Sequence, residues 1–174
     1  MPTRLQSLRD DHRDLVARLE SLRVAAEAVG EVPLAVLQSR VTRAVEFLTG
    51  ELLPHADAEE RGLYPAVARL MGAPEATRTM AEDHLEAARL TVELQVLQSE
   101  LRGPTLAPPV AQELRRILYG LYALITAHLT KEEKVFFPIL EERLTRMEAA
   151  RMFRAMDEFA REAHAVHAVM QQAG

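Results

Sequence analysis

The chain has 174 residues, of which 48% are hydrophobic and 27% are charged, with a formal net charge of −5 at pH 7. This composition predicts a soluble globular protein of one domain. The mild acidity and the lack of a long basic stretch argue against nucleic acid as a partner. Because the sequence contains no cysteine, disulfides, zinc–thiolate sites, cysteine-ligated iron–sulfur clusters and thiol catalysis are excluded.

Nothing in the sequence predicts a membrane protein. A membrane-spanning helix needs about 18 consecutive apolar residues, and the sequence has no such run. The first residues also lack the apolar segment of a signal peptide. By default, we therefore expect a cytoplasmic protein that does not bind a membrane.

Apolar residues recur at spacings of three and four along the chain, which predicts five helices. Their ends are marked, in chain order, by Gly30 and Pro33, by Gly72 and Pro74, by Gly103 and Pro104, by Pro108 and Pro109, and by Thr145, which with Glu148 three residues later predicts a capping box. Short connections favour antiparallel neighbours. We therefore predict a single all-α domain over residues 1–174. It would be an antiparallel up-down four-helix bundle over about residues 3–143, with an additional C-terminal helix over about 145–172.

Polar residues interrupt the apolar stripes of the first four predicted helices. Each stripe contains one histidine: His12, His55, His84 and His128. Two of these helices add a carboxylate four residues later, at Glu59 and Glu132. Residues at i and i+4 lie on one helix face. Unpaired burial of such groups would cost several kcal/mol each, about 2–7 for a neutral polar group, and metal binding would remove that cost.

The polar positions also form an internal repeat. His12 precedes His55 by 43 residues, and His84 precedes His128 by 44. An approximate two-fold bundle would bring four imidazoles and two carboxylates together, which suits two metal ions with bridging carboxylates. Imidazole and carboxylate ligands fit iron, manganese or, less well, zinc.

These residues resemble the haemerythrin-like, or HHE cation-binding, family over about residues 5–140. The resemblance is carried by the lone histidines, by His55-x-x-x-Glu59 with Leu-Tyr-Pro after it, and by His128-x-x-x-Glu132 with Phe-Phe-Pro after it. It implies a four-helix bundle around a non-haem di-iron centre with an oxo or hydroxo bridge. The terminal ligands that it implies are His12, His55, His84 and His128. The bridging ligands that it implies are Glu59 and Glu132. The spacing leaves open which histidines share an iron.

Two positions differ from the oxygen-carrying haemerythrins. Their fifth histidine corresponds to Ala88, and their second bridging carboxylate, an aspartate five residues after its histidine, corresponds to Glu132 at four residues. The resulting set is similar to the branch that repairs iron centres and responds to nitric oxide. Those proteins usually carry an N-terminal domain with cysteines, which this sequence lacks.

We therefore expect a di-iron protein that binds or senses O2, NO or peroxide, or that handles iron. Ala88 would leave space beside one iron, and Leu52, Leu121 and Ile125 would supply an apolar shell. Two alternatives stay open: a di-iron oxidoreductase that reduces peroxide, NO or O2, and a structural bundle that binds zinc. The last helix offers a surface for a homodimer.

Several other polar and aromatic residues have competing interpretations. Glu51 precedes His55 by one turn and is expected to be exposed, with a hydrogen bond or supplementary ligation as alternatives. Tyr64 and Phe137 occupy matching positions and are expected to pack in the core, although Tyr64 could also donate a hydrogen bond or act in redox chemistry. On the last helix, His164 and His167 are expected to be surface groups near the helix end, rather than ligands of an adventitious metal.

Acidic residues also flank the predicted ligands. Adjacent residues of a helix point apart, so we assign no role to Asp11 and Asp83. Glu60 and Glu133 lie about 100° round the helix from the predicted bridges, and we expect them to be surface residues.

Three prolines are expected to disturb the second and fourth helices. Pro54 should kink the helix just before His55. Pro65 and Pro138 should break their helices after both ligands.

Overall fold

The computed structural model describes residues 4–103 and 105–172, with side chains through residue 162. Within these residues the chain forms helices and short connections, and no strand. The helices, including three five-residue π-helices (η), are α1 (Gln6–Ala28), α2 (Leu34–Phe47), η1 (Leu48–Leu52), α3 (Leu53–Ala58), η2 (Glu59–Leu63), α4 (Tyr64–Met71), α5 (Arg78–Glu100), α6 (Pro108–Lys131), η3 (Glu132–Phe136), α7 (Phe137–Arg143) and α8 (Arg146–Gln172).

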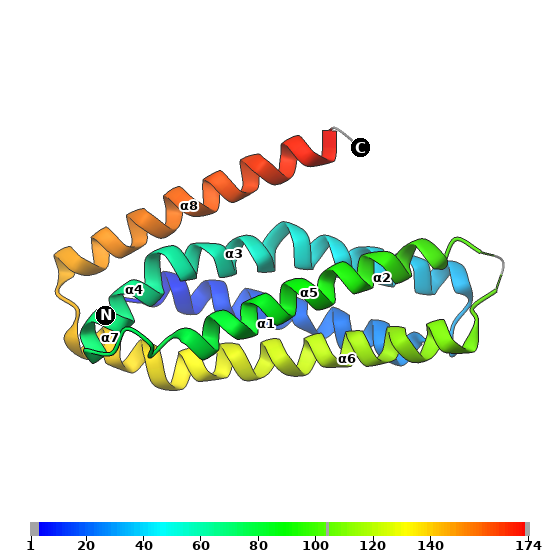
Figure 1. The fold of residues 1–174 in the computed structure, drawn as a ribbon, viewed down its shortest axis with the longest axis horizontal. Helices are drawn as coiled ribbons and strands as arrows, with labels where there is room; N and C mark the ends of the chain where they lie inside the picture. Colours follow the sequence, from blue (N-terminus) through cyan, green and yellow to red (C-terminus); the bar gives the residue numbers. More distant parts are fainter. Residues whose placement is uncertain (1–3, 104, 173–174) are drawn as a thin grey trace.

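These segments join into four long rods and one separate helix, which confirms the predicted bundle architecture. The second rod runs without interruption from α2 to α4, and the fourth from α6 to α7. The rods lie side by side, and α8 lies obliquely against α3 and η2 (Figure 1). The predicted capping box at the start of α8 is present. The Glu148 N–H donates to Thr145 Oγ1 at 3.2 Å, and the Thr145 N–H donates to Glu148 Oε2 at 2.9 Å.

The three π-helices explain how the prolines fit within continuous rods. Each π-helix ends two residues before a proline, at Pro54, Pro65 and Pro138. Proline has no N–H and clashes with the carbonyl four residues back, and the wider turn accommodates both effects. The prediction that Pro65 and Pro138 break their helices is therefore wrong, because α4 and α7 continue beyond them. The predicted kink at Pro54 takes the form of a π turn, η1, which ends just before this proline.

Two apolar cores lie on either side of the polar layer. The larger core fills the bundle from Leu15 to Leu52 and from Ala87 to Leu129. The smaller core contains Leu8, Ala58, Met80 and Phe137, together with residues of α8. Each of the four histidines lies in sequence between a residue of one core and a residue of the other, so the side chains form a polar layer between two apolar ones.

Helix α8 packs closely on the π-helix that follows His55. A Cβ atom at Gly62 would lie 3.1 Å from the backbone nitrogen of Met156 and 3.4 Å from the carbonyl oxygen of Met152. Only glycine allows this approach. The matching residue of the repeat, Val135, is 48% exposed. Helix α8 therefore covers one copy of the repeat and leaves the other uncovered.

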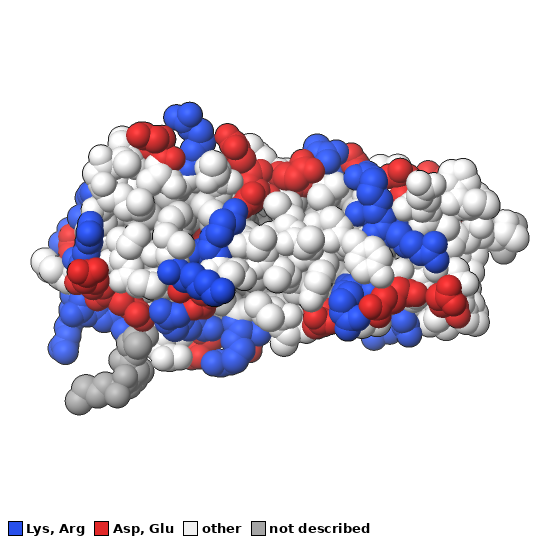
Figure 2. Space-filling view, turned by 90° about the horizontal axis from the view of Figure 1, so that it is seen from below, with Lys and Arg blue, Asp and Glu red and all other residues white. Residues whose placement is uncertain are grey.

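The surface carries both signs of charge. On the face shown in Figure 2, basic and acidic side chains are interspersed and separated by uncharged areas. Many of these charges pair along one helix, as Arg89 does with Glu86 at 2.6 Å. Within residues 4–103 and 105–172, the structure contains no helix that is long and apolar enough to cross a membrane.

Candidate metal centre

All six predicted ligands converge in the polar layer. His12 comes from α1, His84 from α5 and His128 from α6, while His55 lies on α3. The carboxylates Glu59 and Glu132 begin η2 and η3 and are fully buried. Buried carboxylates need partners, and the imidazoles around them are the groups within reach.

The donor atoms form two groups that share one carboxylate. His12, His55 and Glu59 make one group, and Glu59, His84 and His128 make the other. We call them the first half and the second half of the centre. Each half therefore takes its two histidines from one copy of the repeat, a pairing that the spacing left open.

Both carboxylates span the two halves. Glu59 Oε1 lies 3.2 Å from His12 Nε2 and 3.0 Å from His55 Nε2, while its Oε2 lies 3.7 Å from His84 Nε2. Glu132 Oε2 lies 3.6 Å from His12 Nε2, and its Oε1 lies 3.5 Å from His128 Nε2. Each carboxylate thus directs one oxygen to each half, as a bridging ligand must.

Tyr64 adds an oxygen to the second half only. Its hydroxyl donates to Glu132 Oε1 at 2.9 Å and lies 3.3 Å from His84 Nε2 and 3.2 Å from His128 Nε2. The matching residue, Phe137, places its ring 4.8 Å from the His12 ring. Tyr64 is thus both a core residue, 4% exposed, and a hydrogen-bond donor within the centre.

Several buried polar atoms of the centre have no hydrogen-bond partner. They are His12 Nδ1, His55 Nε2, Glu59 Oε2 and Glu132 Oε2. The only other such atom among the described side chains is Ser21 Oγ. An unpaired buried polar atom costs about 1–3 kcal/mol. Three of the four face the space between the histidines and the carboxylates, so the donor set fits metal ions.

The pKa values reflect burial and the close carboxylates. Burial by itself would lower the pKa of His55 and His128, but Glu59 and Glu132 raise both above the ordinary value. Burial and the neighbouring His128 lower the pKa of His84. Burial would raise the pKa of Glu59, yet His55 and His12 hold it well below the ordinary carboxyl value.

The phenol of Tyr64 stays protonated in the metal-free protein. Burial, followed by the charges of Glu132 and Glu59, raises its pKa well above the ordinary value. The hydroxyl therefore has a proton to donate to Glu132. A bound cation would lower the pKa of Tyr64 and so favour the phenolate.

Carboxylates outside the centre face the same histidines, which sequence reasoning missed. His84 Nδ1 lies 2.9 Å from Glu60 Oε1, and His128 Nδ1 lies 3.1 Å from Asp83 Oδ2. His12 Nδ1 lies 3.6 Å from Glu133 Oε1. Glu60 is exposed, as expected, and Glu133 is partly exposed, but both also face these histidines, as does Asp83, to which we assigned no role. The adjacent Asp-His and Glu-Glu pairs, present in both repeats, were the available signal.

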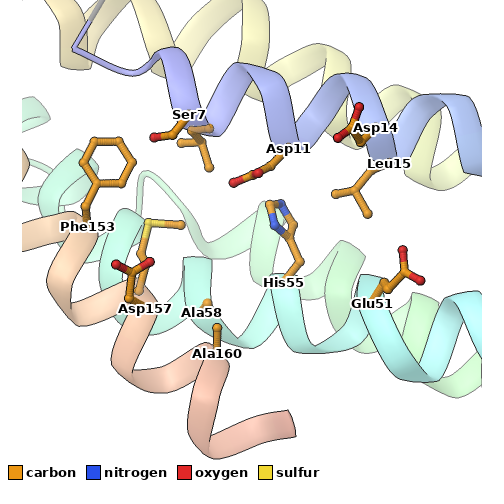
Figure 3. Close-up of a pocket in the computed structure, with 12 residues that line it drawn as sticks. Ser7, Asp11, Asp14, Leu15, Glu51, His55, Ala58, Phe153, Asp157 and Ala160 are labelled. Carbon is orange, nitrogen blue, oxygen red and sulfur yellow. The ribbon is translucent and has the colours of Figure 1, made fainter.

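Three cavities adjoin the centre. One of 330 Å³ lies between α1, α3 and α8 and is lined by Asp11, Glu51, His55 and Asp157, among others (Figure 3). One of 320 Å³ reaches His12 from the groove between α1 and α6. A third, of 20 Å³, is lined by residues of both halves.

The smallest of these cavities lies beside residues of both halves. Ala87 lines it, together with Leu52 and Ile125, and Ala88 does not. The volume of 20 Å³ has room for about one water molecule. Of the expected apolar shell, Leu52 and Ile125 line this cavity, whereas Leu121 is buried elsewhere in the larger core.

Glu51 is not among the donors of either half. Glu51 is 40% exposed at its side chain and pairs with Arg18, in agreement with the exposed interpretation. The side chains of His164 and His167 lie outside the described residues.

Comparison with known proteins gives a family match. The family model described as Hemerythrin HHE cation binding domain matches residues 3–140. Neither the curated proteins nor the solved structures that were compared include a significant match.

Proposed function

Since the chain belongs to the Hemerythrin HHE cation binding family, we propose that it is a non-haem di-iron protein that binds or senses a small ligand, O2, NO or peroxide. His12 and His55 would hold one iron, and His84 and His128 the other. Glu59 and Glu132 would bridge the two. When bound, the two irons would supply redox-active Lewis acids that accept such a ligand.

The shared carboxylate carries this proposal. Glu59 belongs to both groups of donors, and its oxygens face opposite halves. Two donors bonded to one ion at about 2.1 Å lie about 3.0–3.4 Å apart. In the second half, Tyr64, His84 and His128 show this spacing, with pairwise distances of 3.3, 3.2 and 2.9 Å.

The donor types favour iron. Imidazole, carboxylate and phenol donors without thiolates suit iron or manganese better than a structural zinc. A structural zinc site is usually closed by four donors, whereas this centre offers two adjoining groups. Manganese and zinc are therefore the competing outcomes of the test.

The two halves differ in room for a ligand. The second half has five protein donors when Tyr64 is included, and the first half has four. The 330 Å³ cavity ends at His55 of the first half. We expect a small ligand to reach the first half through this cavity, while the apolar residues around the 20 Å³ cavity limit entry of water.

Metal content of protein prepared without oxygen tests the proposal. Wild-type protein supplied with Fe(II) should retain two irons per chain and develop the absorption of an oxo-bridged pair in air. His55→Ala and Glu132→Ala should each lose iron. Glu51→Ala, one turn from His55 and paired with Arg18, is the matched control and should keep both ions.

Three results would overturn the proposal. Full iron content in both His55→Ala and Glu132→Ala would show that the ions bind elsewhere. Retention of zinc alone from a mixture of metals would favour a structural role. Sustained turnover of peroxide or NO above the background of free iron would favour the oxidoreductase instead of a binding or sensing protein.

A further inference from the structure

We propose that carboxylates outside the metal centre position its histidines from neighbouring helices: Glu60 acts on His84 and Asp83 acts on His128, and Glu133 lies where it can act on His12. This inference rests on the proposed metal binding. It assigns a role to residues that do not reach the metal positions themselves.

In the second half, these contacts are made on the outer side of each imidazole. The Nε2 atoms of the four histidines lie near Glu59 or Glu132. On the other side of the ring, the Nδ1 atoms of His84 and His128 lie 2.9 Å from Glu60 and 3.1 Å from Asp83. An Nδ1–H that donates to a carboxylate leaves Nε2 free as the metal-binding nitrogen, and it sets the orientation of the ring.

The first half lacks these hydrogen bonds. His12 Nδ1 lies 3.6 Å from Glu133 Oε1 and has no hydrogen-bond partner. Asp11 and His55 line the same cavity (Figure 3). The positional correspondence between the repeats is complete, because Asp11 matches Asp83 and Glu60 matches Glu133.

These pairs join neighbouring rods. Glu60 on the second rod contacts His84 on the third, and Asp83 on the third contacts His128 on the fourth. Glu133 on the fourth rod lies 3.6 Å from His12 on the first. The orientation of His84 and of His128 therefore depends on a carboxylate from the neighbouring rod.

Two cations hold outer carboxylates in place. Lys131 Nζ lies 2.5 Å from Asp83 Oδ2, and Arg9 pairs with Glu133. The carboxylate of Asp83 therefore lies between the imidazole of His128 and an ammonium group. Because Asp83 contacts both a ligand histidine and a cation, it is the carboxylate chosen for substitution.

Zinc binding to Asp83→Ala and Asp83→Asn tests the proposal. With Zn(II) titrated against a chelator, we expect Asp83→Ala to weaken binding at the second half by about 10–100-fold. Asp83→Asn, which keeps an acceptor oxygen, should recover part of that loss. Glu82→Ala changes the preceding, exposed residue and should leave binding unchanged.

A spectroscopic readout separates positioning from a general structural effect. In zinc-loaded protein with ¹⁵N-labelled histidine, His128 should show a protected Nδ1–H, and Asp83→Ala should lose that signal while the helix content stays the same. If Asp83→Ala binds two zinc ions as tightly as the wild-type protein does, this inference is wrong and the proposed function still stands. Wild-type protein that binds no metal would overturn the proposed function and this inference together.

Discussion

Around His12 and His55 the centre is lined by the phenyl ring of Phe137 and reached by two cavities of 330 and 320 Å³. Around His84 and His128 it is lined by a phenol and adjoined by a cavity of 20 Å³. The two halves use the same ligand types at the same spacing. Their difference comes from single positions, Tyr64 against Phe137 and Gly62 against Val135.

This difference shows how a duplicated site can divide its tasks. The repeat places the histidines and the bridging carboxylates. One hydroxyl then adds a fifth donor to the second half, and one glycine allows α8 to cover the copy of the repeat that carries His55. On our proposal, the second half holds its metal more firmly, while the first half keeps positions for a ligand. The following changes test this division, from the largest expected effect to the smallest.

Glu59→Gln should remove the link between the halves. Because Glu59 belongs to both donor groups and the substitution removes its charge, both ions should bind more weakly, by more than about 100-fold, since even the loss of a supporting group costs about 10–100-fold. His84→Ala should weaken only the ion of the second half. Metal content after gel filtration and titration against a chelator would measure both. One ion bound to Glu59→Gln with wild-type affinity would contradict a shared ligand.

Gly62→Val should separate α8 from the first copy of the repeat. The valine would resemble Val135 in the second copy, but it would overlap Met156. We expect a loss of about 1–3 kcal/mol in the free energy of unfolding, typical of overpacking, measured by urea denaturation. Hydrogen exchange should increase along α8. Val135→Ala, at the exposed matching position, is the control, and equal effects of the two changes would argue against close docking at Gly62.

Tyr64→Phe should make the second half resemble the first. It removes the donor that lies 2.9 Å from Glu132 Oε1, and a lost hydrogen bond to a charged group is worth about 1.5–3 kcal/mol. The ion of the second half should therefore bind at least about tenfold more weakly. Any phenolate-to-Fe(III) absorption should disappear. Tyr122→Phe, which removes a partly buried hydrogen bond to Glu20, should change neither property.

Phe137→Tyr should make the first half resemble the second. The Phe137 ring lies against His12, and the repeat predicts that a hydroxyl there faces Glu59. We expect a gain in affinity of less than about tenfold at the first half, because an added buried hydroxyl also carries a desolvation cost. Binding of NO to the ferrous protein should weaken as the added donor takes a ligand position. Stronger binding of NO would contradict the proposed site of ligand entry.

Local patterns determined much of the fold and of the candidate site. The spacing of apolar residues predicted five helical rods, and Thr145 with Glu148 predicted the start of α8. The helices and the start of α8 depend on interactions within a single helix, and residue spacing in the sequence is enough to predict these. The i, i+4 spacing likewise placed His55 with Glu59 and His128 with Glu132, and the structure brings these pairs together.

Contacts between rods could not be predicted from such spacing. Asp83 was given no role because its side chain points away from the adjacent His84. It faces His128 of another rod instead. Glu60 and Glu133 were expected at the surface, and their proximity to His84 and His12 was likewise not predicted. Their partners depend on how the rods rotate about their axes, which one-helix periodicity does not specify.

The sequence by itself determined which groups are buried together: four histidines and two glutamates at repeated, helix-compatible positions. Only the tertiary structure decided how the aromatic residues join them. Five residues along an α-helix is a rotation of about 140° beyond one full turn, which would direct Tyr64 away from the face of Glu59. The π turns before Pro65 and Pro138 add a residue to the turn, and the neighbouring rods then place Tyr64 against His84 and Phe137 against His12.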